Sequence, residues 1–207
     1  MEGTDQRWMA EALREARKGL FSTPPNPAVG CVVVSAGVRL ASGWHEITGG
    51  PHAEVNAISA ADIPDGCEFY ITLEPCSHHG RTPPCVDAII KAKPARVIVA
   101  MQDPNPEVSG RGLAKLQDEG IAVTCGVLEN EARQINRGFV KRMEQGRPFV
   151  SLKMASSLDG RTALKNGISQ WITSEPARRD VQFLRARASA ILSSASTVEA
   201  DNPMLNL

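Results

Sequence analysis

The sequence predicts an α/β fold in which helices cover both faces of a sheet. The runs VGCVVV (29–34) and RVIVAM (96–101) are apolar on both faces and rich in β-branched residues, as expected of fully buried strands. Segments with a helical period separate such runs, and strands that alternate with helices are typical of a largely parallel sheet. With 42% hydrophobic and 22% charged residues, a chain of 207 residues can bury such a core.

The predicted elements follow one another along the chain. Apolar residues from Met9 to Leu20 recur at helical spacing, and the runs at 29–34 and 38–43 are expected to form a hairpin. Further helices are predicted at 52–61, 84–92 and 112–120, and further strands at 67–73, 96–101 and 121–127. A long helix from about Glu129 to Glu144 is expected to end this part of the chain.

A domain boundary is predicted at the chain-breaking stretch 145–148, which divides the sequence into residues 1–146 and 147–207. The elements expected in the second part are a strand at 149–155, a turn at 157–163, a helix capped by Ser174 with Pro176 in its first turn, and a strand at 188–194. A segment of about 60 residues is too short for a sheet-based domain with a core of its own. We therefore expect it to be the N-terminal part of a truncated domain.

The charge balance and the first residues exclude several classes of protein. Lysine plus arginine equals aspartate plus glutamate at 23 each, so the chain lacks the positive field that non-specific nucleic-acid binding needs. The start of the chain mixes charges into its apolar positions and is neither a signal peptide nor a membrane span. We expect a cytoplasmic protein with a small-molecule partner, no nucleic acid and no membrane.

The cysteines and histidines indicate a metal site. Five cysteines are an odd number, and a reducing cytosol disfavours disulfides. Cys31, Cys67 and Cys125 lie inside apolar strand patterns and are expected in the core. All four histidines fall within a window of 35 residues that begins at His45, which indicates one site.

His52, Cys76 and Cys85 are the candidate metal ligands. One imidazole and two thiolates suit Zn²⁺, and three protein ligands leave the fourth tetrahedral position open, as in catalytic zinc sites. His52 and Cys85 are predicted at helix starts and Cys76 just beyond a strand, where α/β sheets place their sites. Activated water requires a nearby carboxylate to move protons, and Glu54, two residues from His52, is the candidate.

The spacing of these residues leaves alternatives open. The pattern H-x-E followed by P-C-x-x-C is the signature of zinc deaminases that act on nucleobases, but here the eight residues SHHGRTPP separate the two cysteines. One alternative is a closed structural zinc site with His78 or His79 as fourth ligand. Another is a zinc deaminase acting on a nucleoside or on tRNA, which predicts the short cysteine spacing and, for tRNA, a basic surface; the sequence has neither.

Seven strings of the sequence resemble the bifunctional riboflavin-biosynthesis deaminase/reductases. Those similar to the deaminase domain are PNPAVGCVVV (25–34), GWHEITGGPHAE (43–54), LEPCSHHGRTPPC (73–85) and DPNPEVSGRG (103–112). Those similar to the opening of the reductase domain are SLKMASSLDGRTA (151–163), SQWITSEPARRDVQFLRA (169–186) and TVEADNP (197–203). The resemblance covers nearly the whole chain, and the long cysteine spacing is its distinguishing mark.

The resemblance implies a three-layer α/β/α cytidine-deaminase-like domain followed by the start of a dihydrofolate-reductase-like domain. The first would hydrolyse the 2-amino group of 2,5-diamino-6-(5-phosphoribosylamino)pyrimidin-4(3H)-one, with His52, Cys76 and Cys85 holding Zn²⁺ and Glu54 protonating a ring nitrogen and then the departing amine. The second would reduce the ribosyl group to a ribityl chain with NADPH, although we do not expect the 207 residues alone to bind NADPH or reduce anything. A homo-oligomer, dimer or tetramer, is implied as well.

The same resemblance assigns further contacts in the deaminase pocket. Asn26, His45 and Asn105 are its substrate-binding candidates. The alternatives are that Asn26 caps a turn, that His45 is a surface residue, and that DPNP (103–106) is an ordinary turn. The polar loop with His78, His79 and Arg81 suits the substrate's phosphate, or is simply solvated.

In the second part the resemblance assigns eight residues. Cofactor contacts fall on Lys153, Ala155, Trp171, Thr197 and Asp201, and substrate contacts on Ser169, Arg185 and Leu205. Arg185 would pair with the substrate's phosphate. The alternative is that Arg185, on a charged helix, is simply solvated.

Overall fold

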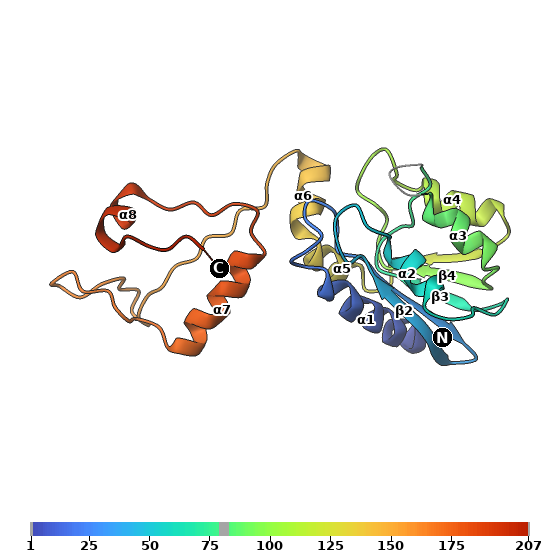
Figure 1. The fold of residues 1–207 in the computed structure, drawn as a ribbon, viewed down its shortest axis with the longest axis horizontal. Helices are drawn as coiled ribbons and strands as arrows, with labels where there is room; N and C mark the ends of the chain where they lie inside the picture. Colours follow the sequence, from blue (N-terminus) through green and yellow to red (C-terminus); the bar gives the residue numbers. More distant parts are fainter. Residues whose placement is uncertain (1, 79–82, 207) are drawn as a thin grey trace. The chain divides into compact units, whose positions relative to one another are not determined.

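The computed structural model describes residues 2–78 and 83–206. The chain forms two compact units, Met1–Phe149 and Val150–Leu207. Figure 1 shows a sheet flanked by helices in the first unit, and helices joined by irregular segments in the second. No helix within the described ranges is long and apolar enough to cross a bilayer.

The first unit is built on a five-stranded sheet with the order β2-β1-β3-β4-β5. The strands are β1 (Gly30–Ser35), β2 (Val38–Trp44), β3 (Glu68–Ile71), β4 (Arg96–Val99) and β5 (Ala122–Cys125). β1 is antiparallel to both of its neighbours, whereas β3, β4 and β5 are parallel. The sheet is therefore mixed rather than largely parallel, because the predicted hairpin places the reversed strand β1 inside it. β2 consequently points in the same direction as β3, β4 and β5.

Both faces of the central strands are apolar, as the sequence predicts. Successive side chains of a strand point to opposite faces. The two sets are Val32, Val34, Tyr70 and Ile98 on one face, and Val33, Phe69, Ile71, Val97 and Val99 on the other. Each of these side chains is at most 1% exposed. The sheet therefore has a hydrophobic core on each side.

Helices cover each of these two cores and complete a three-layer unit. α1 (Glu2–Lys18), α5 (Glu129–Ile135) and α6 (Arg137–Gln145) pack on the first face. α2 (Ala53–Ser59), α3 (Cys85–Lys91) and α4 (Arg111–Asp118) pack on the second. In Figure 1, α1 and α3 accordingly lie on opposite sides of the strands.

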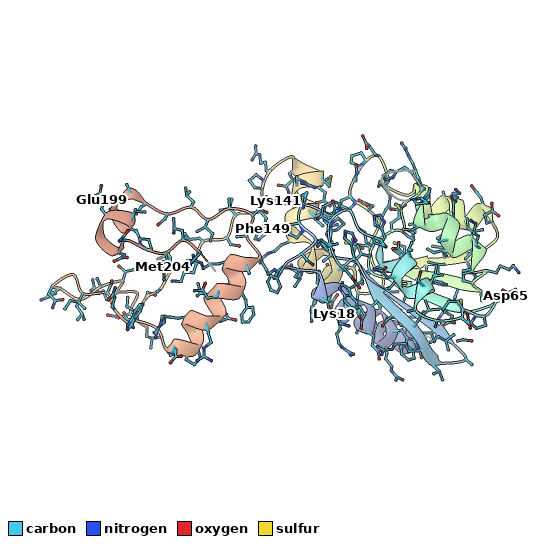
Figure 2. The ribbon with its side chains drawn as sticks, in the orientation of Figure 1. Lys18, Asp65, Lys141, Phe149, Glu199 and Met204 are labelled. Atoms are coloured by element: carbon cyan, nitrogen blue, oxygen red, sulfur yellow. The ribbon has the colours of Figure 1, made fainter. Side chains whose placement is uncertain are left out.

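The predicted long helix from Glu129 to Glu144 is wrong, because the chain breaks at Asn136 into α5 and α6. The buried side chain of Asn136 accepts a hydrogen bond from the Ala28 N–H at 2.8 Å and donates one to the Ala28 carbonyl at 2.9 Å. These bonds satisfy two buried backbone groups that lie far from Asn136 in sequence. Beyond α6 the chain turns back, and the centre of the Phe149 ring lies 4.4 Å from the guanidinium of Arg137, the first residue of the helix, and 5.9 Å from the Lys141 ammonium (Figure 2).

In the second unit the helix prediction is confirmed and the strand predictions are wrong. The Ser174 hydroxyl caps α7 (Glu175–Ala186), as predicted, and α8 (Ala195–Asp201) follows. The segments 149–155 and 188–194 are irregular instead of forming strands. A strand needs a neighbour for its backbone N–H and C=O groups, and neither segment pairs with one in the described part of the chain. Their apolar side chains remain exposed, for example Val150 at 77% and Leu192 at 98%.

The three cysteines predicted in the core differ in their burial. Cys31 and Cys67 are fully buried, as expected. Cys125 is exposed, and that prediction is wrong. β5 is an edge strand with mostly exposed side chains, so an apolar pattern there does not imply burial.

A stability prediction follows from the close contact between α1 and β1. A Cβ atom added at Gly30 would lie 2.1 Å from the carbonyl oxygen of Ala12, so Gly30→Ala must push the helix away from the sheet. We expect it to lower the free energy of unfolding by about 2–3 kcal/mol, measured by urea denaturation.

Gly138→Ala is the matched control. Gly138 lies in α6 with nothing within 4 Å of an added Cβ, and replacing an exposed helical glycine by alanine should stabilise by about 0.5–1 kcal/mol. If Gly30→Ala were as stable as the unaltered protein, the close packing of α1 on β1 would be refuted.

Candidate metal centre

The candidate site residues converge at one edge of the sheet because of the strand directions. β2, β3 and β4 all end at this edge, and His45, Cys76 and Asn105 lie one to six residues beyond these ends. β1 runs the opposite way and begins there, which brings in the preceding segment with Asn26. The carboxyl ends of parallel strands are where open α/β sheets place their ligands.

The side chains of His52, Cys76 and Cys85 form one group whose ligand atoms all lie within 4.8 Å of one another. His52 Nδ1 lies 3.2 Å from the Cys85 sulfur and 3.6 Å from the Cys76 sulfur. In a tetrahedral Zn²⁺ site, the usual Zn–N and Zn–S bond lengths place such atoms about 3.5 Å apart. The donor set and its spacing therefore fit Zn²⁺.

Backbone geometry fixes each of these three side chains. His52 is the residue before the first turn of α2, and Cys85 is the first residue of α3. The Cys85 N–H donates to the Cys76 sulfur at 3.3 Å, so the start of α3 stabilises negative charge on Cys76. α2 can lie close against β2 because residue 43 is a glycine. A Cβ atom at this position would lie 2.4 Å from the backbone nitrogen of Ala57.

The two thiols interact directly, and the interaction shifts their pKa values in opposite directions. A hydrogen bond from Cys85 lowers the pKa of Cys76, and the same bond raises the pKa of Cys85. Metal ligation requires both sulfurs to be deprotonated. The lowered pKa of Cys76 favours its thiolate form, which is the form that binds metal.

Glu54 is a buried carboxylate beside this group. It is 3% exposed, and burial raises its pKa to about 7, while its hydrogen bond with Cys85 acts weakly in the opposite direction. Its Oε2 atom has no hydrogen-bond partner among the described residues. A carboxyl group with a pKa near neutrality and a free oxygen is suited to accept and donate protons.

His45 is buried rather than on the surface, which removes the alternative of a surface residue. It is 3% exposed, and its ring stands edge-on to His52 with 5.4 Å between the ring centroids. Nδ1 lies 3.0 Å from the Pro51 carbonyl, which requires Nδ1 to carry the proton. Nε2, buried and unpartnered within the described ranges, is then free to accept a hydrogen bond.

The loop that carries Asn26 is tied to the loop that follows His45. The Thr48 hydroxyl donates to the Thr23 carbonyl at 2.6 Å and to the Pro24 carbonyl at 3.0 Å. The half-buried Asn26 itself closes a turn, with its N–H 2.8 Å from the Thr23 carbonyl. Together with the contact of Asn136 with Ala28, these bonds hold Asn26 near the strand ends.

Asn105 lies in a turn, as its sequence suggests. Its side-chain oxygen accepts from the Glu107 N–H at 3.1 Å, and its own N–H donates to the Asp103 carboxylate at 2.8 Å. The His78 side chain is exposed. His79 and Arg81 lie outside the described residues.

Sequence reasoning missed two buried carboxylates, Glu74 and Asp103. Glu74 is 4% exposed and accepts hydrogen bonds from backbone N–H groups of the segment after β4. Asp103 is 8% exposed, and burial raises its pKa to about 6. The available signal was their position, since each follows a buried strand within four residues.

Comparisons with known proteins agree with this geometry. Residues 2–101 match the cytidine and deoxycytidylate deaminase zinc-binding region, and residues 148–207 match the RibD C-terminal domain. The riboflavin biosynthesis protein RibD of Escherichia coli K12 is 56% identical over 204 residues, which cover 98% of this chain and 56% of that protein. The chain belongs to the RibD family. The first unit therefore has the cytidine-deaminase-like α/β/α fold that the sequence predicts.

Two solved RibD-type structures resemble the chain along almost all of its length. Acinetobacter baumannii RibD is 48% identical with a TM-score of 0.93, over 100% of this chain and 58% of that one. The Thermotoga maritima diaminohydroxyphosphoribosylaminopyrimidine deaminase/5-amino-6-(5-phosphoribosylamino)uracil reductase is 44% identical with a TM-score of 0.93, over 98% of this chain and 58% of that one. The chain spans somewhat more than half the length of these RibD proteins.

In the second unit, few of the residues predicted to contact cofactor or substrate lie close to one another. The Arg185 guanidinium donates to the carbonyls of Met204 at 3.4 Å and Asn206 at 2.6 Å, on either side of Leu205. The Arg178 guanidinium lies 4.5 Å from the exposed Trp171 ring. Thr197 lies in the capped first turn of α8, and Asp201 is its last residue. Lys153, Ala155 and Ser169 lie on irregular segments, with Lys153 and Ser169 exposed.

The geometry predicts that zinc binding depends on the two clustered cysteines. Replacing Cys76 or Cys85 by alanine removes a thiolate ligand, so we expect zinc to fall from about one ion per chain to a small fraction of that value. Atomic absorption on the purified protein measures the content. Cys125→Ala, at an exposed position that is not part of the group, should retain full zinc, and an equal loss in all three variants would contradict the assignment.

Proposed function

We propose that the first unit is a zinc-dependent deaminase of riboflavin biosynthesis. Its reaction would convert 2,5-diamino-6-(5-phosphoribosylamino)pyrimidin-4(3H)-one and water into 5-amino-6-(5-phosphoribosylamino)uracil and ammonia. The observation that carries this proposal is the buried Glu54, whose free oxygen lies in the same site as the His52, Cys76 and Cys85 group. A purely structural zinc site has no use for such a carboxylate.

The zinc assignment gives each residue a role. His52, Cys76 and Cys85 would hold the ion, and bound Zn²⁺ lowers the pKa of a coordinated water to about 7. Glu54 accepts the proton of the attacking water and passes it to a ring nitrogen. It would then take the second proton of the water from the new hydroxyl group on the ring carbon and give it to the departing amine. The C–N bond breaks, the C–O bond becomes a carbonyl, and ammonia leaves. Burial, which raises the pKa of Glu54 to about 7, suits both directions of transfer.

Three residues around this group are proposed to bind the pyrimidine and its ribose. His45 would accept a hydrogen bond through Nε2, because its other ring nitrogen is engaged by Pro51. Asn26 and Asn105 would contribute amide hydrogen bonds from the loops before β1 and after β4. The substrate is a small polar molecule, and the equal numbers of acidic and basic residues favour it over tRNA.

For the whole protein we propose a second, NADPH-dependent activity that reduces the ribosyl group to a ribityl chain. The match of residues 148–207 to the RibD C-terminal domain supports it. Lys153, Ala155, Trp171, Thr197 and Asp201 would contact the cofactor, and Ser169, Arg185 and Leu205 the substrate. We also propose a homo-oligomer, dimer or tetramer, located in the cytoplasm.

The alternative of a closed structural zinc site requires a fourth protein ligand. In the described part of the chain, the metal-ligating group contains the three side chains named above, and His78 is exposed. Among the described residues no side chain fills a fourth position, while His79 lies outside them. The unpaired oxygen of Glu54 is therefore the observation that favours catalysis.

Glu54→Gln distinguishes the catalytic from the structural hypothesis. The amide cannot carry the proton, so kcat for ammonia release from the diaminopyrimidine phosphate should fall by at least about a hundredfold. Zinc content, measured in parallel, should be unchanged. Glu119→Gln, at an exposed carboxylate at the end of α4, serves as the control and should behave as the unaltered protein. Full activity in Glu54→Gln would reject Glu54 as the proton carrier.

A further inference from the structure

A single buried carboxylate, Glu74, connects the loop that carries Cys76 with the segment after β4. Its Oε2 atom accepts hydrogen bonds from the backbone N–H groups of Asp103 at 3.0 Å and Gly110 at 2.9 Å. Its Oε1 atom accepts from Gly112 at 2.8 Å and from Leu113 at 3.4 Å. A carboxylate that accepts several backbone hydrogen bonds forms a strong, charge-assisted anchor.

The contact between these two segments is close as well as polar. The Glu74 N–H donates to the Met101 carbonyl at 3.0 Å, so the strand extensions stay paired up to this point. A Cβ atom added at Gly112 would lie 2.1 Å from the carbonyl oxygen of Pro75. The first turn of α4 therefore rests directly against the residue that precedes Cys76.

The anchored segment includes Asn105. Glu74 holds the backbone N–H of Asp103, and the Asp103 carboxylate in turn accepts the N–H of Asn105 at 2.8 Å. Two hydrogen bonds thus connect the Glu74 carboxylate to the backbone of Asn105. Gly110 and Gly112 fix the other end of the loop to the same carboxylate.

We propose that Glu74 is a positioning residue for substrate binding, which holds residues 103–113 so that Asn105 faces the pyrimidine next to the metal group. The inference rests on the deaminase function proposed above. Glu74 itself touches backbone groups and not the substrate. Glutamine in its place keeps the shape but turns an N–H₂ group towards backbone N–H donors, so the anchor is lost without leaving a cavity.

The test compares the kinetics of Glu74→Gln with those of the unaltered protein. We expect KM for the diaminopyrimidine phosphate to rise at least about tenfold while kcat changes less than about threefold, because the metal group and Glu54 are retained. Zinc content should remain at about one ion per chain. If Glu74→Gln is insoluble, Glu74→Asp, which keeps the charge but shortens the reach, should show the same split.

Glu68→Gln is the matched control for a merely structural effect. Glu68 is a partly buried carboxylate at the opposite end of β3, where it binds Arg96 and the Tyr70 hydroxyl. Glu68→Gln should lower the free energy of unfolding and leave KM within about twofold of the value for the unaltered protein. A double variant, Glu74→Gln with Asn105→Ala, should have a KM close to that of the worse single variant, because both changes remove the same interaction.

Three results would overturn the proposal: an unchanged KM in Glu74→Gln, a loss of zinc, or fully additive effects in the double variant. Amide hydrogen exchange separates this failure from a failure of the proposed function. Faster exchange at Asp103, Gly110 and Gly112 in Glu74→Gln reports loss of the anchor whether or not the protein deaminates. Absence of ammonia release by the unaltered, zinc-loaded protein would instead reject the deaminase function.

Discussion

Burial of both faces of β1, β3 and β4 is the constraint on which the rest of the structure depends. Since no polar side chain can point away from these strands without entering a core, chemistry is restricted to the strand ends. The directions of β2, β3 and β4 then bring their carboxyl ends to one edge. His45, Cys76 and Asn105 lie at the same edge of the sheet because each follows one of these ends, although many residues separate them in sequence.

Much of this arrangement could be predicted from the sequence. The apolar runs identify the five strands, and the residues that follow them identify the metal group, because its ligand types are rare and closely spaced. The eight residues between Cys76 and Cys85 distinguish the RibD family, and the Escherichia coli member is 56% identical to the chain. For these elements the structure that the local sequence favours is the one found in the fold, as is usual in natural proteins.

The features that could not be predicted all depend on partners distant in sequence. Asn136 breaks a periodic helix because Ala28 requires its side chain, and no local pattern shows that requirement. Cys125 is exposed because β5 is an edge strand, a property of the strand order and not of the strand. The segments 149–155 and 188–194 have the composition of strands, but a strand forms only where another strand pairs with it, and composition does not show whether one is present. Glu74 was overlooked because its partners are backbone groups 29 to 39 residues away, which leave no mark on composition.

Two polar atoms of the first unit that remain unsatisfied provide the strongest physical argument for catalysis. Glu54 Oε2 and His45 Nε2 are buried without hydrogen-bond partners in the described part of the chain. Each such atom costs about 1–3 kcal/mol of stability, a considerable fraction of the margin of a small domain. By contrast, the equally buried Glu74 has its oxygens fully occupied by backbone donors. The same fold therefore can satisfy a buried carboxylate, and it leaves Glu54 unsatisfied where a substrate ring and a water molecule would complete its hydrogen bonds.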